Sequence, residues 1–314
     1  MQEKNIIANT YWADNERFAD IMNVGLFQKK VLTAEQLSER DGYLGRVKQR
    51  QKESGLQRNR DVTKKAAYGT NFVIVSAENQ DSIHYAMPVR IMGYEFMEYN
   101  RQLKELQTLH DKKKDLYGAE FLSGLSADDK LQAVCTLVIY YGKQPWTGPT
   151  CLADMLDFSE IPEVIRDIIT DYPIHVVDAR RFEDSEKLET EARLFFGMLQ
   201  RDEDADSWQE YVNQNKEGFQ NLSTDTYDAI ATFTKMGQML DTKEMYEDEN
   251  GGCDMCKAME DLIARGEARG EVLGENRILM LIQKMTTDEM LDQIPRITTD
   301  TEFCKEMLKK YNIS

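Results

Sequence analysis

The sequence predicts an α/β protein in which a mixed sheet is flanked by helices and is followed by an α-helical C-terminal region. Three short runs rich in apolar and β-branched residues are predicted as buried strands, at Phe72–Ala77, Leu131–Tyr141 and Ile174–Asp178. After the first of these, apolar residues recur at three- and four-residue steps from Val89 to Leu106, which indicates an amphipathic helix. The last third of the chain shows mostly helical spacing.

The first predicted helix spans Asn15 to Asn23, with Phe18 on its inner side. The same helix carries Asp20. Two interpretations of Asp20 stay open, because this acid either faces a functional site or lies on the surface.

A polar, basic segment comes before the predicted strands. Eight Lys and Arg residues between Arg46 and Lys65 are opposed only by Glu53 and Asp61. A basic rim beside an acid site suits a phosphodiester substrate, whereas a solvated charged loop is the plainer alternative. The candidate DNA contacts are Arg58, Arg60, Lys64, Lys65 and, in the first turn of the next helix, Arg90.

The candidate catalytic residues lie at the ends of two strands. Asp61 opens the extended run before the predicted strand, and Glu78, Asn79 and Gln80 follow the strand. Because side chains alternate along a strand, Glu78 and Gln80 project to one side. Two carboxylates, the Asn79 carbonyl and water form the kind of oxygen-rich shell that Mg²⁺ or Mn²⁺ accepts. The alternative is that these groups are ordinary solvated polar residues at strand ends.

The second half of the chain contains a predicted domain boundary. After a predicted helix over Ser185–Gln200, the acidic stretch Asp202–Asp206 separates residues 1–205 from a helical region at 206–314. In that region Gly266, Gly270 and Gly274 recur every four residues and share one helix face.

Each of these glycines costs about 1 kcal/mol relative to Ala in a helix, which favours a compensating contact such as a homo-oligomer interface; a weak helix is the alternative. Two capping boxes, at Thr286–Glu289 and Thr299–Glu302, predict the starts of short terminal helices.

Composition sets limits on the partners of this protein. Its net charge is −17, yet residues 1–118 hold 19 Lys and Arg against 16 Asp and Glu, so the acidity lies in the rear of the chain. Duplex DNA binds mainly through neutralised phosphates, which favours the front part as the DNA-binding part. With no long apolar run, we expect a cytoplasmic protein without a membrane partner. Cys253 and Cys256 are expected to be reduced thiols rather than half of a zinc site.

Four stretches of the sequence resemble the Rpn family of recombination-promoting nucleases, and they occur in the order that the family shows. They are YWADNERFADIMN (Tyr11–Asn23), RDVTKKA (Arg60–Ala66), ENQDSIHYAMPVRIMGYEFMEYNRQ (Glu78–Gln102) and VIYYGKQPW (Val138–Trp146). The resemblance implies a PD-(D/E)XK restriction-endonuclease-like core, dependence on Mg²⁺ with Mn²⁺ as an alternative, and cleavage of DNA.

The same resemblance implies roles for individual residues. Asp61 corresponds to the first motif acid, Glu78 to the second, and Gln80 to the position that usually holds Lys. Asp20 matches a first-helix acid that often adds to the metal shell. We therefore expect a metal-dependent DNA endonuclease that promotes recombination or transposition. A transposase-derived DNA- or protein-binding module without catalytic activity is the alternative, because Gln80 carries no positive charge.

Overall fold

The computed structural model describes residues 2–40, 61–69, 71–234, 236–249 and 251–313. Their contacts divide the chain into two compact units, Met1–Asp254 and Met255–Ser314. The boundary predicted after residue 205 does not coincide with this division. Helix α7 (Ala205–Gln214) packs on α6 (Ala192–Arg201), and α9 (Thr224–Phe233) packs on α1 (Gln2–Ala13), so these helices belong to the first unit.

The first unit is built on a five-stranded mixed sheet with the strand order β1-β2-β3-β4-β5. The strands are β1 (Leu37–Glu39), β2 (Val62–Tyr68), β3 (Asn71–Gln80), β4 (Ala133–Tyr140) and β5 (His175–Asp178). Strands β1, β2 and β3 are antiparallel neighbours, while β4 and β5 run parallel to β3. The mixed α/β architecture and all three predicted strands are therefore confirmed.

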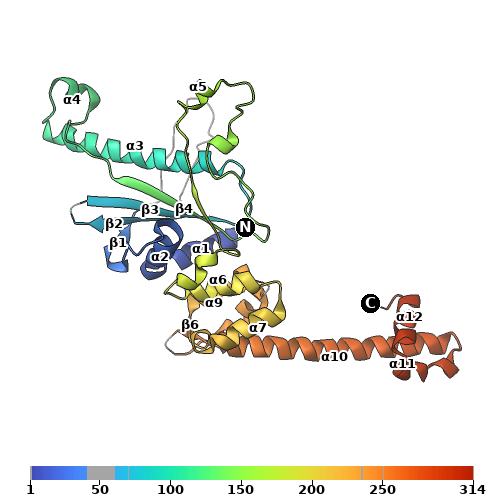
Figure 1. Ribbon diagram of the computed structural model, residues 1–314. Helices are drawn as coiled ribbons and strands as arrows, with labels where there is room; N and C mark the ends of the chain where they lie inside the picture. Colours follow the sequence, from blue (N-terminus) through green and yellow to red (C-terminus); the bar gives the residue numbers. More distant parts are fainter. Residues whose placement is uncertain (1, 41–60, 70, 235, 250, 314) are drawn as a thin grey trace. The chain divides into compact units, whose positions relative to one another are not determined.

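Helices cover both faces of this sheet (Figure 1). Helix α3 (Met87–Lys113), which has Pro88 in its first turn, lies along one face, where Ile91 and Tyr94 pack on Val138 of β4. Helices α1 and α2 (Asn15–Ile21) lie on the other face. With both faces covered, the side chains of β3 are buried along most of the strand.

The core on the α1 side is aromatic. Tyr11, Trp12, Phe18, Phe195 and Phe196 are all at most 1% exposed. Burying each large apolar side chain contributes about 1.5–3 kcal/mol, so this cluster holds α1, α2 and α6 together. Helix α1 is not predicted from the sequence, because polar residues interrupt the apolar spacing along it.

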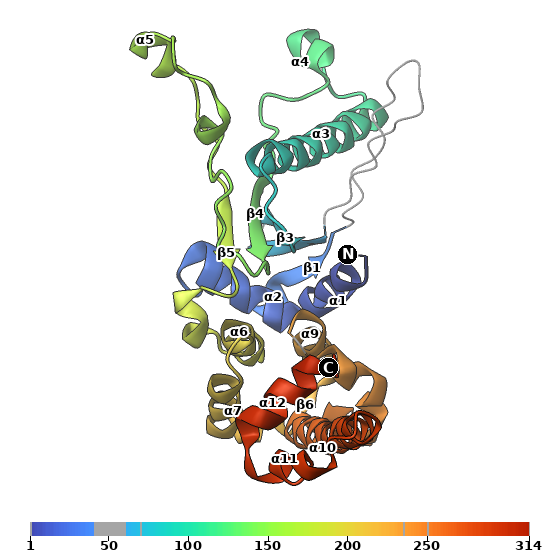
Figure 2. The same cartoon turned by 90° about the vertical axis from the view of Figure 1, so that its right-hand side faces the viewer.

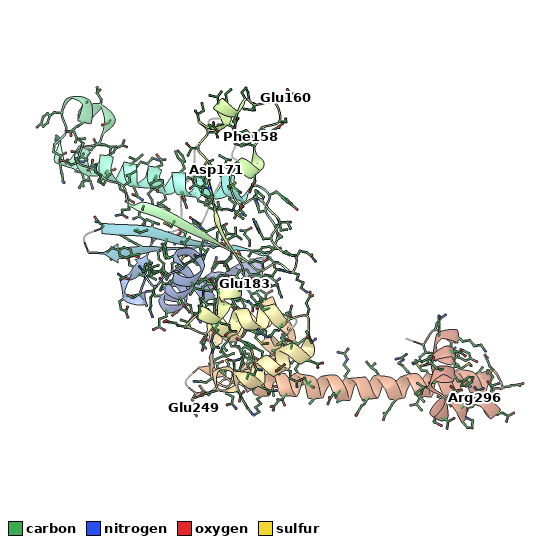
Figure 3. All side chains as sticks on the ribbon, in the orientation of Figure 1. Phe158, Glu160, Asp171, Glu183, Glu249 and Arg296 are labelled. Atoms are coloured by element: carbon green, nitrogen blue, oxygen red, sulfur yellow. The ribbon has the colours of Figure 1, made fainter. Side chains whose placement is uncertain are left out.

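The chain between β4 and β5 extends away from the sheet and carries the one-turn helix α5 (Glu163–Arg166) (Figure 2). Phe158, Glu160 and Asp171 lie on this extension, whereas Glu183 lies beyond β5 and nearer the sheet (Figure 3). The helix predicted over Ser185–Gln200 is instead two elements. A 3₁₀ turn, η4 (Glu183–Lys187), is followed by α6.

Short elements complete the first unit. They are η1 (Met22–Phe27), η2 (Ala34–Gln36), α4 (Gly118–Ser123), η3 (Ala153–Met155), α8 (Lys216–Phe219), β6 (Leu222–Ser223), η5 (Gly237–Met245) and β7 (Gly252–Cys253). Of the described helices, none is long and apolar enough to cross a membrane.

The second unit consists of the long helix α10 (Met255–Thr287), then η6 (Leu291–Gln293), α11 (Arg296–Thr299) and α12 (Thr301–Lys310). Its core is formed by Leu281, Met285, Ile297 and Met307.

Both predicted capping boxes are wrong. Thr286 lies inside α10, where its hydroxyl donates to the Ile282 carbonyl at 2.8 Å. Helix α12 is capped instead by Asp300, which accepts a hydrogen bond from the Phe303 amide at 3.0 Å. The short Asp side chain satisfies an amide that the helix cannot.

The three spaced glycines lie on the exposed part of α10. Within the described chain, no atom lies within 4 Å of a Cβ placed at Gly266, Gly270 or Gly274. The contact that would offset their cost is not made by the described part of this chain, and an oligomer through this region stays a prediction.

Candidate active site

Asp61 and Glu78 lie at the same end of the β2–β3 hairpin, Asp61 directly before β2 and Glu78 near the end of β3. The strands pair in the register Val62 with Ala77, and one further step places Asp61 opposite Glu78. Two hydrogen bonds from described residues fix Asp61 there. Its Oδ2 accepts the main-chain amide of Asn79 at 2.7 Å, and its Oδ1 accepts the Asn5 side chain at 3.3 Å. The local strand pairing thus brings the two predicted acids together.

Glu78 points to the α3 face of the sheet and is only 1% exposed. Its Oε1 lies 2.5 Å from Nη2 of Arg90 and accepts the hydroxyl of Tyr94 at 3.5 Å. Arg90 and Tyr94 lie one turn apart on α3, and the Arg90 Nε donates to the Tyr94 oxygen at 2.9 Å. A buried carboxylate is costly without a partner, and the start of α3 provides one.

Gln80 lies beside Glu78, as strand alternation predicts. Its amide nitrogen donates to the Asn79 carbonyl at 2.8 Å and to Glu78 Oε1 at 3.4 Å. These contacts hold the Gln80 side-chain amide at the carboxyl end of β3. Because the amide is neutral, Gln80 adds no positive charge to the site.

The Asn79 side chain points to the opposite face and belongs to a buried chain of hydrogen bonds. Trp12 Nε1 donates to the Tyr141 hydroxyl at 2.5 Å, and that hydroxyl donates to Asn79 Oδ1 at 2.9 Å. The Asn79 amide then donates to Asn9 Oδ1 at 2.9 Å. This hydrogen-bond network fixes the backbone of Asn79. It therefore also fixes the Asn79 amide that donates a hydrogen bond to Asp61.

Burial raises the pKa of Asp61 above its ordinary value, and the Asn79 amide and the positive charge of Arg90 partly oppose that shift. Arg90 also pairs with Glu78, so the charge of one guanidinium acts on both Asp61 and Glu78. Burial and the Glu78 charge likewise raise the pKa of Tyr94, so its hydroxyl stays protonated at neutral pH.

A small cavity of about 170 Å³ opens beside these groups. It is lined by Lys4, Asn5, Ala8, Asn79, Gln80, Asp81, Ser82, Arg90, Tyr141 and Phe233. The lining is mostly polar and includes two basic side chains, Lys4 and Arg90, and one acid, Asp81, which is paired with Lys4.

Asp61, Glu78 and the Asn79 carbonyl could hold a metal ion. Their oxygen atoms are the hard donors that Mg²⁺ and Mn²⁺ take, with water completing the shell. Among the described residues, no group of three or more His, Cys, Asp or Glu is placed to hold a metal. Any metal here would therefore depend on two carboxylates, one of which now binds Arg90.

Asp20 is not brought to this pair. Its Oδ2 accepts the main-chain amides of Glu189 and Thr190 at 2.9 and 2.8 Å, and the Thr190 hydroxyl at 2.7 Å. It lines a separate cavity of about 810 Å³, next to α2 and η4, which includes neither Asp61 nor Glu78. The predicted third acid instead holds the segment before α6, because a carboxylate satisfies two free amides there.

The predicted DNA contacts have different outcomes. Lys64 is 1% exposed, and its Nζ donates to the Ala13 carbonyl at 2.5 Å and to Asn15 Oδ1 at 2.6 Å. It therefore anchors α2 to the sheet and offers no surface for DNA. Lys65 is half-buried on the opposite face of β2. Arg58 and Arg60 lie outside the described residues, and Arg90 lies in the site.

Several residues around the site were missed from the sequence. Asn5 and Asn9 are spaced by four on α1 and reach Asp61 and Asn79. Tyr94 follows Arg90 by four residues on α3. The four-residue spacing of these pairs is the signal in the sequence that they share a helix face. Asn5 and Asn9 are uncharged amides, however, and nothing else in the sequence marks them as functional.

The fold and the site define a mixed α/β protein with two acids at one end of a β-hairpin and an arginine bound to one of them. A family model described as putative transposase, YhgA-like, matches residues 61–229. The chain belongs to this transposase-related family, which agrees with the resemblance found in its sequence. Neither a comparison with curated proteins nor one with solved structures found a match.

Proposed function

We propose that this protein is a metal-dependent DNA endonuclease with a PD-(D/E)XK-type core, which hydrolyses phosphodiester bonds in recombination or transposition. The observation that carries the proposal is the placement of two acids at one end of the hairpin, Asp61 directly before β2 and Glu78 near the end of β3. Membership in a transposase-related family supports DNA as the substrate. The basic front part of the chain supports it further.

The proposed chemistry assigns a task to each side chain. Asp61 and Glu78 would hold Mg²⁺, or Mn²⁺, together with the Asn79 carbonyl. A bound metal lowers the pKa of a water molecule and stabilises charge on phosphate oxygens. Gln80 would orient the attacking water or the scissile phosphate through its amide. Asn5 and the Asn79 amide would keep the Asp61 carboxylate in place.

A second candidate is a catalytically inactive transposase-derived module that binds DNA or protein. The specific observation in its favour is that Gln80 stands where the motif usually has Lys, and that Arg90 already neutralises Glu78. Such a module has no need of a metal site that depends on Asp61.

Calorimetric titration of Mn²⁺ tests the proposal and separates the two candidates. We expect binding to wild type, loss of binding in Asp61→Ala, and unchanged binding in Asp20→Ala, because Asp20 lies apart. Cleavage of supercoiled plasmid should disappear in the same Asp61 variant. Equal metal binding and equal cleavage by Asp61→Ala would refute the assignment.

A further inference from the structure

Arg90 on α3, a candidate DNA contact, has no task in the proposed chemistry. The motif position that usually supplies a cation is occupied by Gln80, a neutral amide that is already hydrogen-bonded to its own strand. Displacement at phosphorus concentrates negative charge on the phosphate oxygens, and fixed positive charge stabilises that state. A second positive charge, besides that of the proposed metal, would therefore have to come from another element.

We propose that Arg90 is this cation, contacting the scissile phosphate in place of a motif lysine, while Tyr94 positions its guanidinium. The inference rests on the proposed nuclease function and adds a catalytic residue to it. Arg90 is the one described basic residue whose side chain both binds a site acid and lines the adjoining cavity.

The other basic residues near the site fit this role less well. Lys64 points to the other face of the sheet and is buried against α2. Lys4 lines the same cavity, but its ammonium lies 3.1 Å from Asp81, and both side chains are about two-fifths exposed. Such an exposed pair fixes its groups weakly. Arg90 is the better-ordered cation, because Glu78 and Tyr94 both hold it.

The geometry leaves the guanidinium able to bind a further anion. Nη2 faces Glu78 and Nε faces Tyr94, while Nη1 has no hydrogen-bond partner in the described part of the chain. A planar guanidinium has five N–H donors in a fork that matches two phosphate oxygens. Since Arg90 lines the cavity at the end of β3, a phosphate bound there would meet these donors.

The same contact places a positive charge beside the buried Glu78 carboxyl group. Arg90 serves as the counter-ion of this buried carboxylate. If Glu78 held a metal ion, the Arg90 guanidinium would be free to contact the phosphate. Removing Arg90 should therefore not abolish metal binding.

Plasmid nicking and Mn²⁺ titration of four proteins test this proposal: wild type, Arg90→Gln, the double variant Arg90→Gln/Gln80→Lys, and Lys104→Gln. The last variant removes one exposed charge from the same helix and is the matched control. We expect Arg90→Gln to nick at least about 100-fold more slowly, as for loss of one transition-state donor, with Mn²⁺ affinity equal to or higher than wild type.

Restoring a lysine at the motif position should recover at least tenfold of the lost rate. If Arg90→Gln does not fold, the double variant decides alone, since its new ammonium can pair with Glu78; nicking within tenfold of wild type supports the proposal, and slower nicking overturns it. Wild-type nicking by Arg90→Gln, or loss of its Mn²⁺ binding, also overturns it. Absence of nicking by wild type would instead contradict the proposed nuclease function itself.

Discussion

Replacing Arg90 by glutamine removes the guanidinium that lies 2.5 Å from the buried Glu78 carboxylate. Removing one partner of a buried ion pair typically costs about 3–5 kcal/mol. Here the Arg90 side chain is 31% exposed, and Glu78 keeps contacts to Tyr94 and Gln80. We therefore expect a smaller loss of about 2 kcal/mol in the free energy of unfolding, equivalent to a fall of about 4–8 °C in melting temperature.

Urea unfolding followed by tryptophan fluorescence measures this loss in the full chain. Trp12, Trp146 and Trp208 are the three tryptophans, and all lie in the first unit, so the signal reports the unit that contains the site. In a Glu78→Gln background the carboxylate charge is gone, and Arg90→Gln should then cost less than about 0.5 kcal/mol. Equal costs in both backgrounds would refute the role of Arg90 as counter-ion.

Three further substitutions separate structural from functional residues. Lys64→Met should lower the free energy of unfolding by about 1–3 kcal/mol, because it leaves the Asn15 and Ala13 oxygens unsatisfied, yet leave DNA affinity in a gel-shift assay unchanged; weaker binding in a fully stable variant would contradict its buried role. Asp20→Ala should cost a similar amount, through its lost bonds to Thr190, without changing Mn²⁺ affinity, and a calorimetric change would return Asp20 to the metal site. Burial raises the pKa of Asp61, so its contribution to stability is present below the ordinary value of 3.8 and is lost as pH rises through the raised value. Asp61→Asn should therefore raise the melting temperature of the metal-free protein at pH 7 but not near pH 3.8; an equal change at both pH values would exclude this cause.

Much of the sheet and of the acid pair is predictable from the sequence. The strand at β3 is short, apolar and β-branched, and strand alternation alone places Glu78 and Gln80 on one face. Pro88 and the apolar spacing after it locate α3, and therefore Arg90 in its first turn. These patterns depend only on residues close together in the sequence, so they can be interpreted without the tertiary structure.

The structure differs from the expectations where the role of a residue depends on contacts with distant parts of the chain. Lys64 belongs to a basic run and was therefore predicted to contact DNA. The alternation of side chains along β2 points it toward α2 instead, where its ammonium group donates hydrogen bonds to two oxygen atoms. The acidic stretch after residue 201 resembles a linker, yet Asp204 caps α7 by accepting the amides of Asp206 and Ser207. Asp20 resembles a site acid because its neighbours match a family motif, while its actual partners lie 169 and 170 residues away.

The most direct test of the central claim is nicking of supercoiled plasmid by wild type and Asp61→Ala, with Mg²⁺, with Mn²⁺ and with chelator. Lys104→Gln, which changes an exposed residue of α3, serves as the purification control. We predict nicking by wild type and the control with either metal, none with chelator, and none by Asp61→Ala. Nicking that persists with chelator or in Asp61→Ala would contradict a metal site at this acid pair, and absence of nicking under every condition would favour the binding module.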